Sequence, residues 1–555
     1  MRAQNKAGRR RHAILNHLGA TGMAAVLSVS GQTVLAQATN PATSVEQQNA
    51  QRLQQLAATP RQTGPVVISP EASSGEIAPA GGPTVRLVGV EFTTSDFLTQ
   101  ADLDAVLVKY VGKQIDFSQI QRLVQDINDL YTEKGVITAS AVLPPQTLDR
   151  GLLKVQLVEG KLASVAMSGN KQVPDQFVLD RVRLTRGEDT VDVPSAATDI
   201  NRFNKIYNAQ LRMSLQPGAS FGTTDLALQL TEPKTNQLSF FLDNQGVNST
   251  GQAQLGAFYH RYSLFTPDDN FLAFGAVAEG SVSGTLSYDA PISPLGTRLS
   301  VTYSGSQIKV VDGPSEPLNI RGKSHSLAAS LSHPMFISPE WAVFGVAGTS
   351  FGVSESNSNG TPLVDSKTEK YSLGLNASFA NQKMAFSISP QITYAVANDY
   401  LAPSTRDIGL FTGSFNGTYQ LDNGIALTTN GAWQYTNSKL LPGDLLFQIG
   451  GPSTVRGFPS DAASGDSGYF AQFEAHKGVS IEGLANQADV YGFVDLGAVY
   501  STFPEEVFLM SAGVGVTFAL SDKVKFELGL GVPLVQAVAN QDAATLYARL
   551  TAVTF

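Results

Sequence analysis

The feature that most constrains this chain is a long C-terminal region in which short segments alternate between apolar and polar residues. After Pro233, segments of roughly ten residues follow one another in this manner up to Phe555. In residues 523–530, for example, four apolar side chains alternate with Lys, Lys, Glu and Gly. A period of two places successive side chains on opposite faces of a β-strand. No stretch after the N-terminus contains about 18 consecutive apolar residues, which excludes a bundle of membrane-spanning helices.

The number of such segments distinguishes between the two folds that alternating strands can form. We count about sixteen strands in about 320 residues, whereas a soluble sandwich needs only about seven to nine and turns its apolar face inward. The charged fraction is only 15%, which suits strands that face lipid on one side and a wet lumen on the other. The predicted fold class is therefore mainly β, with a transmembrane β-barrel of about 16 antiparallel strands over residues 235–555.

The lengths of the connections give this barrel a direction. The joins placed after even-numbered strands are mostly short, at residues 293–296, 381–382, 422–424 and 521–522. Two of the joins after odd-numbered strands are long, at residues 308–322 and 354–370. Outer-membrane barrels have short periplasmic turns and longer external loops. The pattern therefore predicts a bacterial outer-membrane location with the N-terminal region in the periplasm.

The N-terminus carries the features of an export signal. Five basic residues within residues 2–11 precede a mildly apolar stretch, and Ala36-Gln37-Ala38 fits the small-x-small cleavage pattern. We predict a signal peptide over residues 1–38; a cytosolic amphipathic helix is the alternative. In residues 39–83, a short helix is expected from Ser44 to Ala58, followed by a Pro-rich linker. The sequence leaves open whether this helix is a disordered tail or a removable plug of the barrel.

Two successive modules of one plan lie between the linker and the barrel. Residues 84–161 are expected to form a strand, two helices and two further strands, in that order. The second of these helices has apolar residues on one face only, and Gly135 ends it. Residues 162–234 repeat the same order. The repeat predicts two small β-α-α-β-β domains in front of the barrel.

The sequence offers no candidate active site. Its six His residues show no metal-binding spacing, and it contains neither a Gly-x-Ser-x-Gly elbow nor a phosphate-binding loop before a helix. With no Cys, the chain has no thiolate metal site and no disulfide. The net charge of -9 argues against a nucleic-acid partner. We therefore expect no enzymatic activity, no metal and no cofactor.

One loop, between the eleventh and twelfth expected strands, places an arginine among glycines and apolar residues. Its sequence is Gly450-Gly451-Pro452-Ser453-Thr454-Val455-Arg456-Gly457-Phe458. In the next strand but one, the apolar residues flanking Asp495 are expected to face lipid, so Asp495 should point into the lumen. If the loop folds inward, Arg456 can form a bidentate pair with Asp495. An exposed arginine and an unrelated luminal aspartate are the open alternative.

These residues resemble the signatures of a known superfamily. Val455-Arg456-Gly457-Phe458 resembles the motif of the sixth barrel loop in the Omp85 superfamily, and Gly492-Phe493-Val494-Asp495 resembles its partner in the barrel wall. The two modules look like POTRA domains, the first over residues 84–161 and the second over residues 162–234. Further stretches are similar to the haemolysin/haemagglutinin secretion-activation family of two-partner-secretion transporters: Leu143-Pro144-Pro145-Gln146, Gly151-Leu152, Val158-Glu159-Gly160 and Leu242-Asp243-Asn244-Gln245-Gly246.

The resemblance implies a transporter that takes an unfolded exoprotein with an N-terminal secretion domain from the periplasm and passes it through its own barrel. The POTRA domains would capture this partner, and strand addition to an exposed sheet edge is one physical route. Residues 152–158 are the candidate edge, unless that strand is internal to its sheet. The candidate client-binding residues on it are Leu152, Lys154, Gln156 and Val158. Outer-membrane lipid, and a barrel assembly machinery that reads the aromatic C-terminus, are the other expected partners.

Three rival functions remain open for a chain of this kind. An assembly factor of the same superfamily would usually carry more POTRA domains than the two expected here. A passive porin would lack periplasmic modules, and a membrane-embedded hydrolase would need a nucleophile constellation that the sequence does not contain. Secretion of a protein partner separates the transporter from all three.

Overall fold

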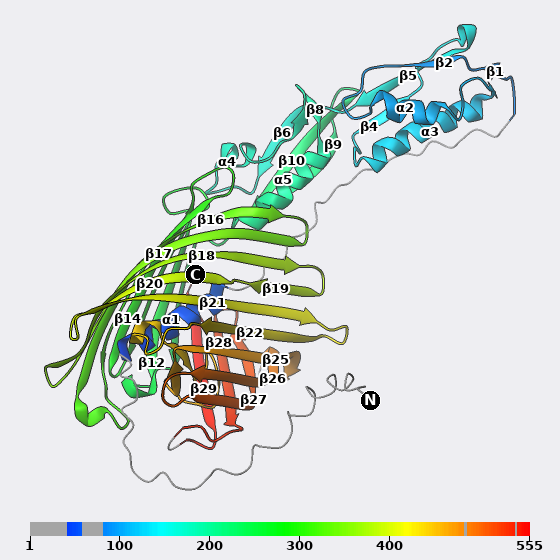
Figure 1. Ribbon diagram of the computed structural model, residues 1–555. Helices are drawn as coiled ribbons and strands as arrows, with labels where there is room; N and C mark the ends of the chain where they lie inside the picture. Colours follow the sequence, from blue (N-terminus) through cyan, green and yellow to red (C-terminus); the bar gives the residue numbers. More distant parts are fainter. Residues whose placement is uncertain (1–40, 58–80, 482–484, 539–540, 555) are drawn as a thin grey trace, which may run out of the picture. The chain divides into compact units, whose positions relative to one another are not determined.

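The computed structural model describes residues 41–57, 81–481, 485–538 and 541–554 (Figure 1). The predicted signal peptide and most of the predicted linker lie outside the described residues. The described chain begins with helix α1 (Pro41–Ala57), which is followed by two α/β modules and a closed barrel. Among the described residues, no helix is long and apolar enough to cross a membrane.

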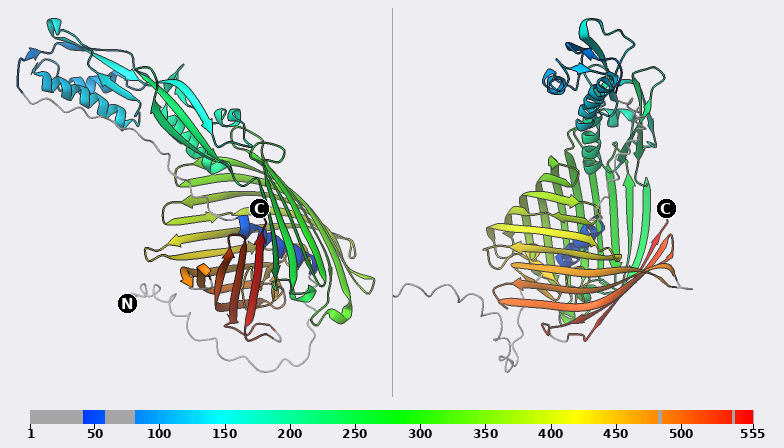
Figure 2. Two further views of the ribbon diagram at one scale, coloured as in Figure 1. Left: turned by 180° about the vertical axis from the view of Figure 1, so that it is seen from behind. Right: turned by 90° about the vertical axis from the view of Figure 1, so that its right-hand side faces the viewer.

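The barrel is a closed antiparallel sheet in which consecutive strands pair and β29 closes on β11 (Figure 1, Figure 2). β19 and β20 are two parts of one strand, because both lie between β18 and β21. The barrel therefore has 16 strands, and the predicted fold class is confirmed. The strands are β11 (Asn236–Asp243), β12 (Gln254–Tyr262), β13 (Asn270–Ala278), β14 (Ser281–Pro291), β15 (Arg298–Lys309), β16 (Ile320–Ile337), β17 (Trp341–Ser358), β18 (Thr361–Ala380), β19 (Met384–Ile388), β20 (Gln391–Asp399), β21 (Ser404–Gln420), β22 (Ile425–Tyr435), β25 (Ser467–Ile481), β26 (Ala485–Tyr500), β27 (Glu506–Ser521), β28 (Val524–Pro533) and β29 (Thr545–Val553).

The two faces of the barrel wall differ as the alternation predicts. On β16, Leu327 and Leu331 are exposed on the outer face, whereas Ser324 and Ser326 point inward and bond to helix α1. Outward apolar side chains meet lipid in a membrane, and inward hydroxyls meet water or other polar groups. The period of two therefore separates a lipid face from a luminal face along each strand.

The closing strand β29 is regular once its faces are assigned. Its alternation is blurred in the sequence, because the aromatic Tyr547 and the charged Arg549 share a face. That face is the luminal one: Tyr547 bonds to the loop between β22 and β25, and Arg549 bonds to Asp243 at 2.9 Å. Leu546 and Leu550 are exposed on the outer face.

Of the two long joins predicted after odd-numbered strands, one is a loop and the other is not. Residues 310–319 connect β15 to β16, in agreement with the prediction. The loop predicted at residues 354–370 is wrong, because β17 and β18 continue through this region and are joined at Asn359 and Gly360, both with positive φ. Cross-strand pairs there include Glu355 with Asp365. Since most side chains on both faces of this extension are polar, the amphipathic alternation that marks membrane-spanning strands does not reveal it.

Each N-terminal module packs helices against one face of a small mixed sheet. The first comprises β1 (Val85–Arg86), β2 (Gly89–Phe92), α2 (Gln100–Leu107), β3 (Gln114–Ile115), α3 (Phe117–Glu133), β4 (Ala139–Val142) and β5 (Leu152–Glu159). The second comprises β6 (Lys161–Ser168), α4 (Asp175–Leu179), β7 (Thr185–Arg186), β8 (Thr190–Val191), α5 (Val193–Ile206), β9 (Gln210–Pro217) and β10 (Thr223–Thr231). In α3, Asp116 caps the N-terminus by accepting the N–H of Gln119 at 2.9 Å. Ile120, Leu123 and Ile127 form its buried stripe.

The strand over residues 152–158, predicted as a candidate edge, is central in its sheet. β5 pairs with β2 on one side and with β4 on the other, so it offers no free edge to a client strand. Sequence order alone does not say which strand is inserted between the others. The outer strands are β2 and β4 in this sheet and β7 and β9 in the sheet of the second module, and the two that lie beside a long helix are β4 and β9. Each is partly covered by a helix asparagine: Asn128 accepts the N–H of Ala141 at 2.7 Å, and Asn204 bonds both backbone groups of Leu211, at 2.6 and 2.9 Å.

Candidate functional site

The loop between β22 and β25 carries the motif singled out in the sequence and folds into the barrel. It contains a short hairpin, β23 (Phe447–Ile449) and β24 (Ala463–Gly465). Val455 and Phe458 are 0% and 1% exposed, and they pack among apolar side chains of the hairpin and the barrel wall: Ile449, Phe470, Val499 and Leu509. Gly457 has a φ of 89°, which side chains other than glycine rarely adopt. Burial of the apolar motif residues holds the loop inside the lumen.

The structure brings Arg456 and Asp495 together. The guanidinium donates from Nε and Nη2 to the two carboxylate oxygens of Asp495, each at 2.7 Å, and the backbone N–H of Arg456 donates to the same carboxylate at 3.0 Å. Both residues are buried, with Asp495 0% exposed. A planar fork that meets a carboxylate in this bidentate manner fixes direction as well as distance. The arrangement orients the loop relative to β26.

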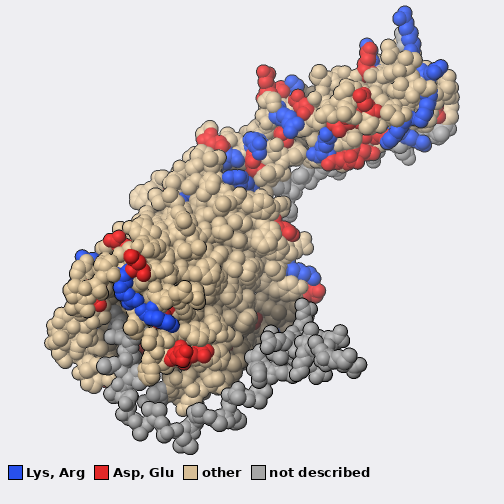
Figure 3. All heavy atoms as spheres, in the orientation of Figure 1, with Lys and Arg blue, Asp and Glu red and all other residues tan. Residues whose placement is uncertain are grey.

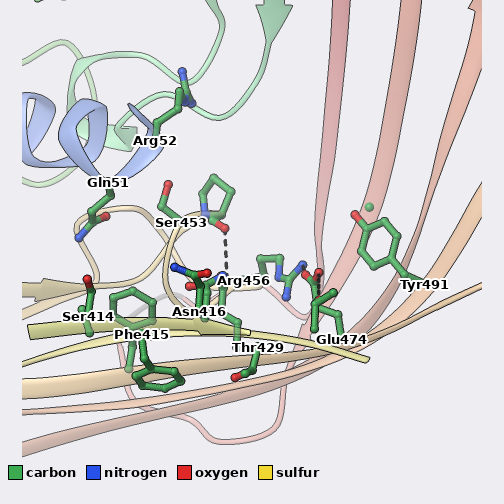
Figure 4. A pocket seen from close by; sticks show the side chains of 18 of the residues that line it. Gln51, Arg52, Ser414, Phe415, Asn416, Thr429, Ser453, Arg456, Glu474 and Tyr491 are labelled. Atoms are coloured by element: carbon green, nitrogen blue, oxygen red, sulfur yellow. Dashed lines mark hydrogen bonds and ion pairs between the residues drawn. The ribbon is translucent and has the colours of Figure 1, made fainter. Parts of the chain in front are cut away.

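Two further residues complete the Arg456 site, and one of them, Glu474, is labelled in Figure 4. Phe493, part of the predicted barrel-wall motif, lies under the guanidinium, whose central carbon is 3.6 Å from the ring centre. Glu474 on β25 accepts a bond from Nη1 of Arg456 and is also bonded by His476 at 2.8 Å. The sequence reasoning missed Glu474. Its signal was the run of three polar side chains on one face of β25, Gln472, Glu474 and His476, beside the strand of Asp495.

Gly457 joins the loop to the closing strands of the barrel. Its N–H donates to the hydroxyl of Tyr547 at 2.7 Å, and its carbonyl accepts from Thr545 at 3.0 Å. A Cβ added to Gly531 on β28 would lie 2.7 Å from the nitrogen of Gly457, so that strand must carry a glycine for the loop to approach. Alternation along one strand does not predict these contacts, because they depend on how the strands are staggered around the barrel. Gly492, a predicted site residue, has no comparable close approach; a Cβ there would meet nothing nearer than 3.9 Å.

Helix α1 lies inside the barrel beside the strands β14, β15 and β16 (Figure 2). The helix starts at Pro41, so Ser44 lies within it and the expected start at Ser44 is wrong. Glu46 accepts hydrogen bonds from three wall hydroxyls: Ser304, Ser324 and Ser326. Asn49 donates to Ser283 at 2.8 Å. Of the two possibilities that the sequence left open, the position of the described helix in the lumen favours the plug.

The plug helix contacts both the inward loop and the end of the first barrel strand. Gln48 donates to the carbonyl of Gln245 at 2.8 Å and to the hydroxyl of Ser460, in the loop, at 3.3 Å. Ser460 in turn donates to the carbonyl of Gly246 at 3.4 Å. Movement of any one of these three elements therefore breaks hydrogen bonds with the other two.

Arg52 of the plug helix lies near a carboxylate that already has a partner. Its Nη2 is 3.8 Å from Asp243, which Arg549 binds at 2.9 Å. Asp243 thus has a charge partner that does not belong to the helix. A cavity of about 370 Å³ lies between the helix, the loop and the wall, with Arg52, Arg456 and Glu474 among its lining residues (Figure 4).

Replacement of Glu46 by alanine is expected to loosen the plug. The change leaves the hydroxyls of Ser304, Ser324 and Ser326 without their shared acceptor, so the helix should leave the lumen more readily. In planar bilayers, the channel should therefore be open for a larger fraction of the time. Ala50→Ser, one turn further along the same helix and at an exposed position, is the matched control. Equal conductance of both variants and the wild type would show that the serine cluster does not retain the helix.

The four predicted client-binding residues lie in the first module rather than near the loop. Leu152, Lys154 and Gln156 are exposed on one face of β5, and Val158 is half-buried. The intervening residues face the module core. Lys154 lies 3.9 Å from Glu91 on the adjacent strand. A partner can contact these side chains on the face of the sheet, but it cannot add a strand to β5.

Comparison with known proteins gives matches for the barrel and for the first module. Residues 222–518 match the family described as haemolysin secretion/activation protein ShlB/FhaC/HecB, and residues 85–160 match the POTRA domain of the ShlB type. The outer membrane transporter CdiB of Dickeya dadantii is 24% identical over 79% of this chain and 81% of its own length. The heme/hemopexin transporter protein HuxB of Haemophilus influenzae is 24% identical over 80% and 82%. Among solved structures, CdiB from Escherichia coli aligns with a TM-score of 0.68 at 20% identity, over 94% of this chain and 100% of that chain.

Proposed function

The chain belongs to the haemolysin secretion/activation family of two-partner-secretion transporters in the outer membrane, and on that premise we propose that its own barrel is the route by which an exoprotein partner leaves the cell. The observation that carries the proposal is the largely polar docking of helix α1 in the lumen. Helix α1 is held mainly by hydroxyl, amide and carboxylate contacts, with Ala42 and Val45 as its small apolar anchor. Water or a polypeptide can replace such contacts at modest cost.

Displacement of the plug is the first step of the proposed transport. Residues 58–80 connect the helix to the first POTRA domain. A chain of this length spans up to about 80 Å when fully extended, at about 3.5 Å a residue. The helix can therefore leave the lumen toward the periplasm while it stays tethered. The inward loop remains attached to β26 through Arg456 and Asp495 and keeps one side of the lumen in a fixed shape.

Capture of the partner is proposed to use the free edge of β9 in the second module, by addition of a client strand. Leu211 is closed to such pairing because Asn204 occupies both of its backbone groups. Further along β9, Met213 and Leu215 have the same outward direction, and β9 has β10 as its sheet partner on the other side. This edge replaces residues 152–158 as the candidate for strand addition.

The remaining partners are also proposals. Exposed apolar and aromatic side chains on the outer wall, such as Leu373, Ile392 and Trp341, support contact with outer-membrane lipid. Residues 1–38 are proposed to be a signal peptide, and the aromatic C-terminus a signal for the barrel assembly machinery. For the domain limits we propose the values that the sequence predicts: linker and plug at 39–83, POTRA domains at 84–161 and 162–234, and the barrel at 235–555.

Secretion in a reconstituted host tests the proposal. A large exoprotein from the same genome, carrying an N-terminal secretion domain, is expressed with or without this chain in a bacterium that has no such transporter. We expect the exoprotein in the medium when the chain is present, and no release of a periplasmic marker enzyme. Release of marker and exoprotein together would instead indicate a leaking pore, and absence of the exoprotein from the medium would contradict the proposal for that partner.

A further inference from the structure

Three backbone segments meet at one end of the first POTRA domain and form a single surface. Residues 85–92 form two short strands, because the chain turns at Leu87 and Val88 from β1 to β2. The N–H of Leu87 donates to the carbonyl of Lys113 at 3.0 Å, and its carbonyl accepts from Gly112 at 2.8 Å. The N–H of Val88 donates to the carbonyl of Gly151 at 2.7 Å. The side chains of this tip surface are Arg86, Val88, Val111, Lys113, Arg150 and Leu152.

The tip surface exposes apolar side chains that the domain does not need for its own core. Val88 is 61% exposed and Leu152 is 40% exposed. Their sequence neighbours Leu87 and Leu153 are 0% and 2% exposed and supply the core at these positions. Exposed apolar side chains gathered on a domain outside the membrane mark a binding surface more often than scattered ones do.

The same surface is basic, and no described carboxylate of the domain pairs with its cations. Arg86, Lys113 and Arg150 are exposed, and among the described side chains none of the three has a carboxylate within ion-pair distance. The ammonium group of Lys113 donates instead to the carbonyl of Lys109. Figure 3 shows basic side chains gathered toward this end of the first module. Cations without partners on a surface attract acidic groups.

Arg150 occupies a backbone conformation that does not favour arginine. Its φ is 59° and its ψ is 19°, in the left-handed region where glycine and asparagine are favoured. The next residue, Gly151, is required by the fold, because a Cβ there would lie 2.3 Å from the carbonyl oxygen of Arg86. No such contact requires a long cationic side chain at Arg150. A strained position with an exposed charge is typical of a functional rather than a structural residue.

We propose that the tip surface binds an extended segment of the exported partner in which acidic residues alternate with apolar ones. The inference rests on the proposed function, since it names the chemistry of the client segment that the first POTRA domain recognises. Three cations surround a small apolar patch, so glutamate or aspartate side chains can pair with the cations while valine or leucine side chains cover Val88 and Leu152. A membrane surface would instead be met by a helix with a broad apolar face. The tip consists of strands and turns.

Peptide binding to the full-length protein in detergent tests the inference. The probe is a fluorescent decapeptide of alternating valine and glutamate, compared with one of alternating valine and lysine. We expect tighter binding of the glutamate peptide, weakened about two- to fivefold by Arg150→Gly, which removes one exposed charge contact. The triple variant Arg86→Ser/Lys113→Ser/Arg150→Gly should weaken it at least about tenfold. Lys171→Ser, which removes an exposed cation of the second module, is the matched control and should bind as the wild type does.

Two further measurements separate recognition from stability and from transport. Arg150→Gly should leave the melting temperature unchanged or raise it, because glycine adopts the left-handed conformation without strain; a lower melting temperature together with weaker binding would mean a structural role. Equal binding of both peptides would overturn the inference, as would unchanged peptide binding by the triple variant. A triple variant that loses binding to anionic lipid vesicles but still binds the glutamate peptide would overturn it as well. In the secretion host, failure of the wild type to export would count against the proposed function, whereas normal export by the triple variant would count against the tip surface alone.

Discussion

Replacement of Arg456 by alanine is expected to abolish export while the barrel still inserts into the outer membrane. The change leaves Asp495, which is 0% exposed, and Glu474 as neighbouring carboxylates without their cation. Removal of one member of a buried ion pair costs about 3–5 kcal/mol, which is enough to release the loop from the wall. The barrel itself should persist, because its strands close through β11 and β29 independently of the loop.

Three variants distinguish the guanidinium from a simple positive charge. Arg456→Lys should be nearly as defective as alanine, since an ammonium group cannot bond both oxygens of Asp495 and also lie flat over Phe493. Exchange of the charges (Arg456→Asp with Asp495→Arg) should not restore export, because the new aspartate would face Glu474. Lys323→Ala, which removes an exposed ion pair with Glu355, is the control and should secrete normally. Normal secretion by Arg456→Ala and by Asp495→Ala would show that the pair is incidental.

Gly531→Ala is expected to impair export almost as strongly, although it removes no atom that bonds to the loop. The new Cβ would lie 2.7 Å from the nitrogen of Gly457 and force the loop away from β28. Overpacking of this kind costs about 1–3 kcal/mol and here also breaks the bonds of Gly457 to Tyr547 and Thr545. Protease access to the loop, measured in purified protein, should rise together with the loss of secretion.

The same strand provides a matched control for this variant. Gly529 lies two residues before Gly531 on the same face, and a Cβ there would meet its nearest atom at 3.4 Å, which a small shift accommodates. Gly529→Ala should therefore secrete nearly as the wild type does. Similar defects in both variants would point to a general intolerance of side chains in β28 rather than to the loop contact.

The alternation of apolar and polar residues predicted the barrel, because the two faces of each strand can be recognised from the sequence of that strand alone. A period of two, read along Lys523 to Leu530, needs no knowledge of the neighbouring strands. The contact between Arg456 and Asp495 could be predicted for a related reason. The apolar residues on the other face of the strand showed that Asp495 points into the lumen. Both inferences depend on geometry within one strand or loop.

Relations between elements were harder to predict. Glu474, Gly531 and Tyr547 approach the loop only because the closed barrel fixes the stagger of its strands, which alternation does not encode. The central place of β5 depends on sheet order, and the polar extension of β17 and β18 carries no amphipathic signal. The early start of α1 at Pro41 reflects the tolerance of the first helical turn for proline.

Site-specific crosslinking inside the barrel tests most directly whether the partner passes through it. The chain contains no cysteine, so single cysteines can be introduced without background. Ser326 on β16 faces the lumen, where it bonds to the plug, and the adjacent Leu327 is 52% exposed on the outer face. With an exoprotein arrested by a folded C-terminal fusion domain, Ser326→Cys should form a crosslink to the exoprotein and Leu327→Cys should not. Crosslinks of equal yield at both positions, or at Leu327→Cys alone, would contradict transport through the lumen.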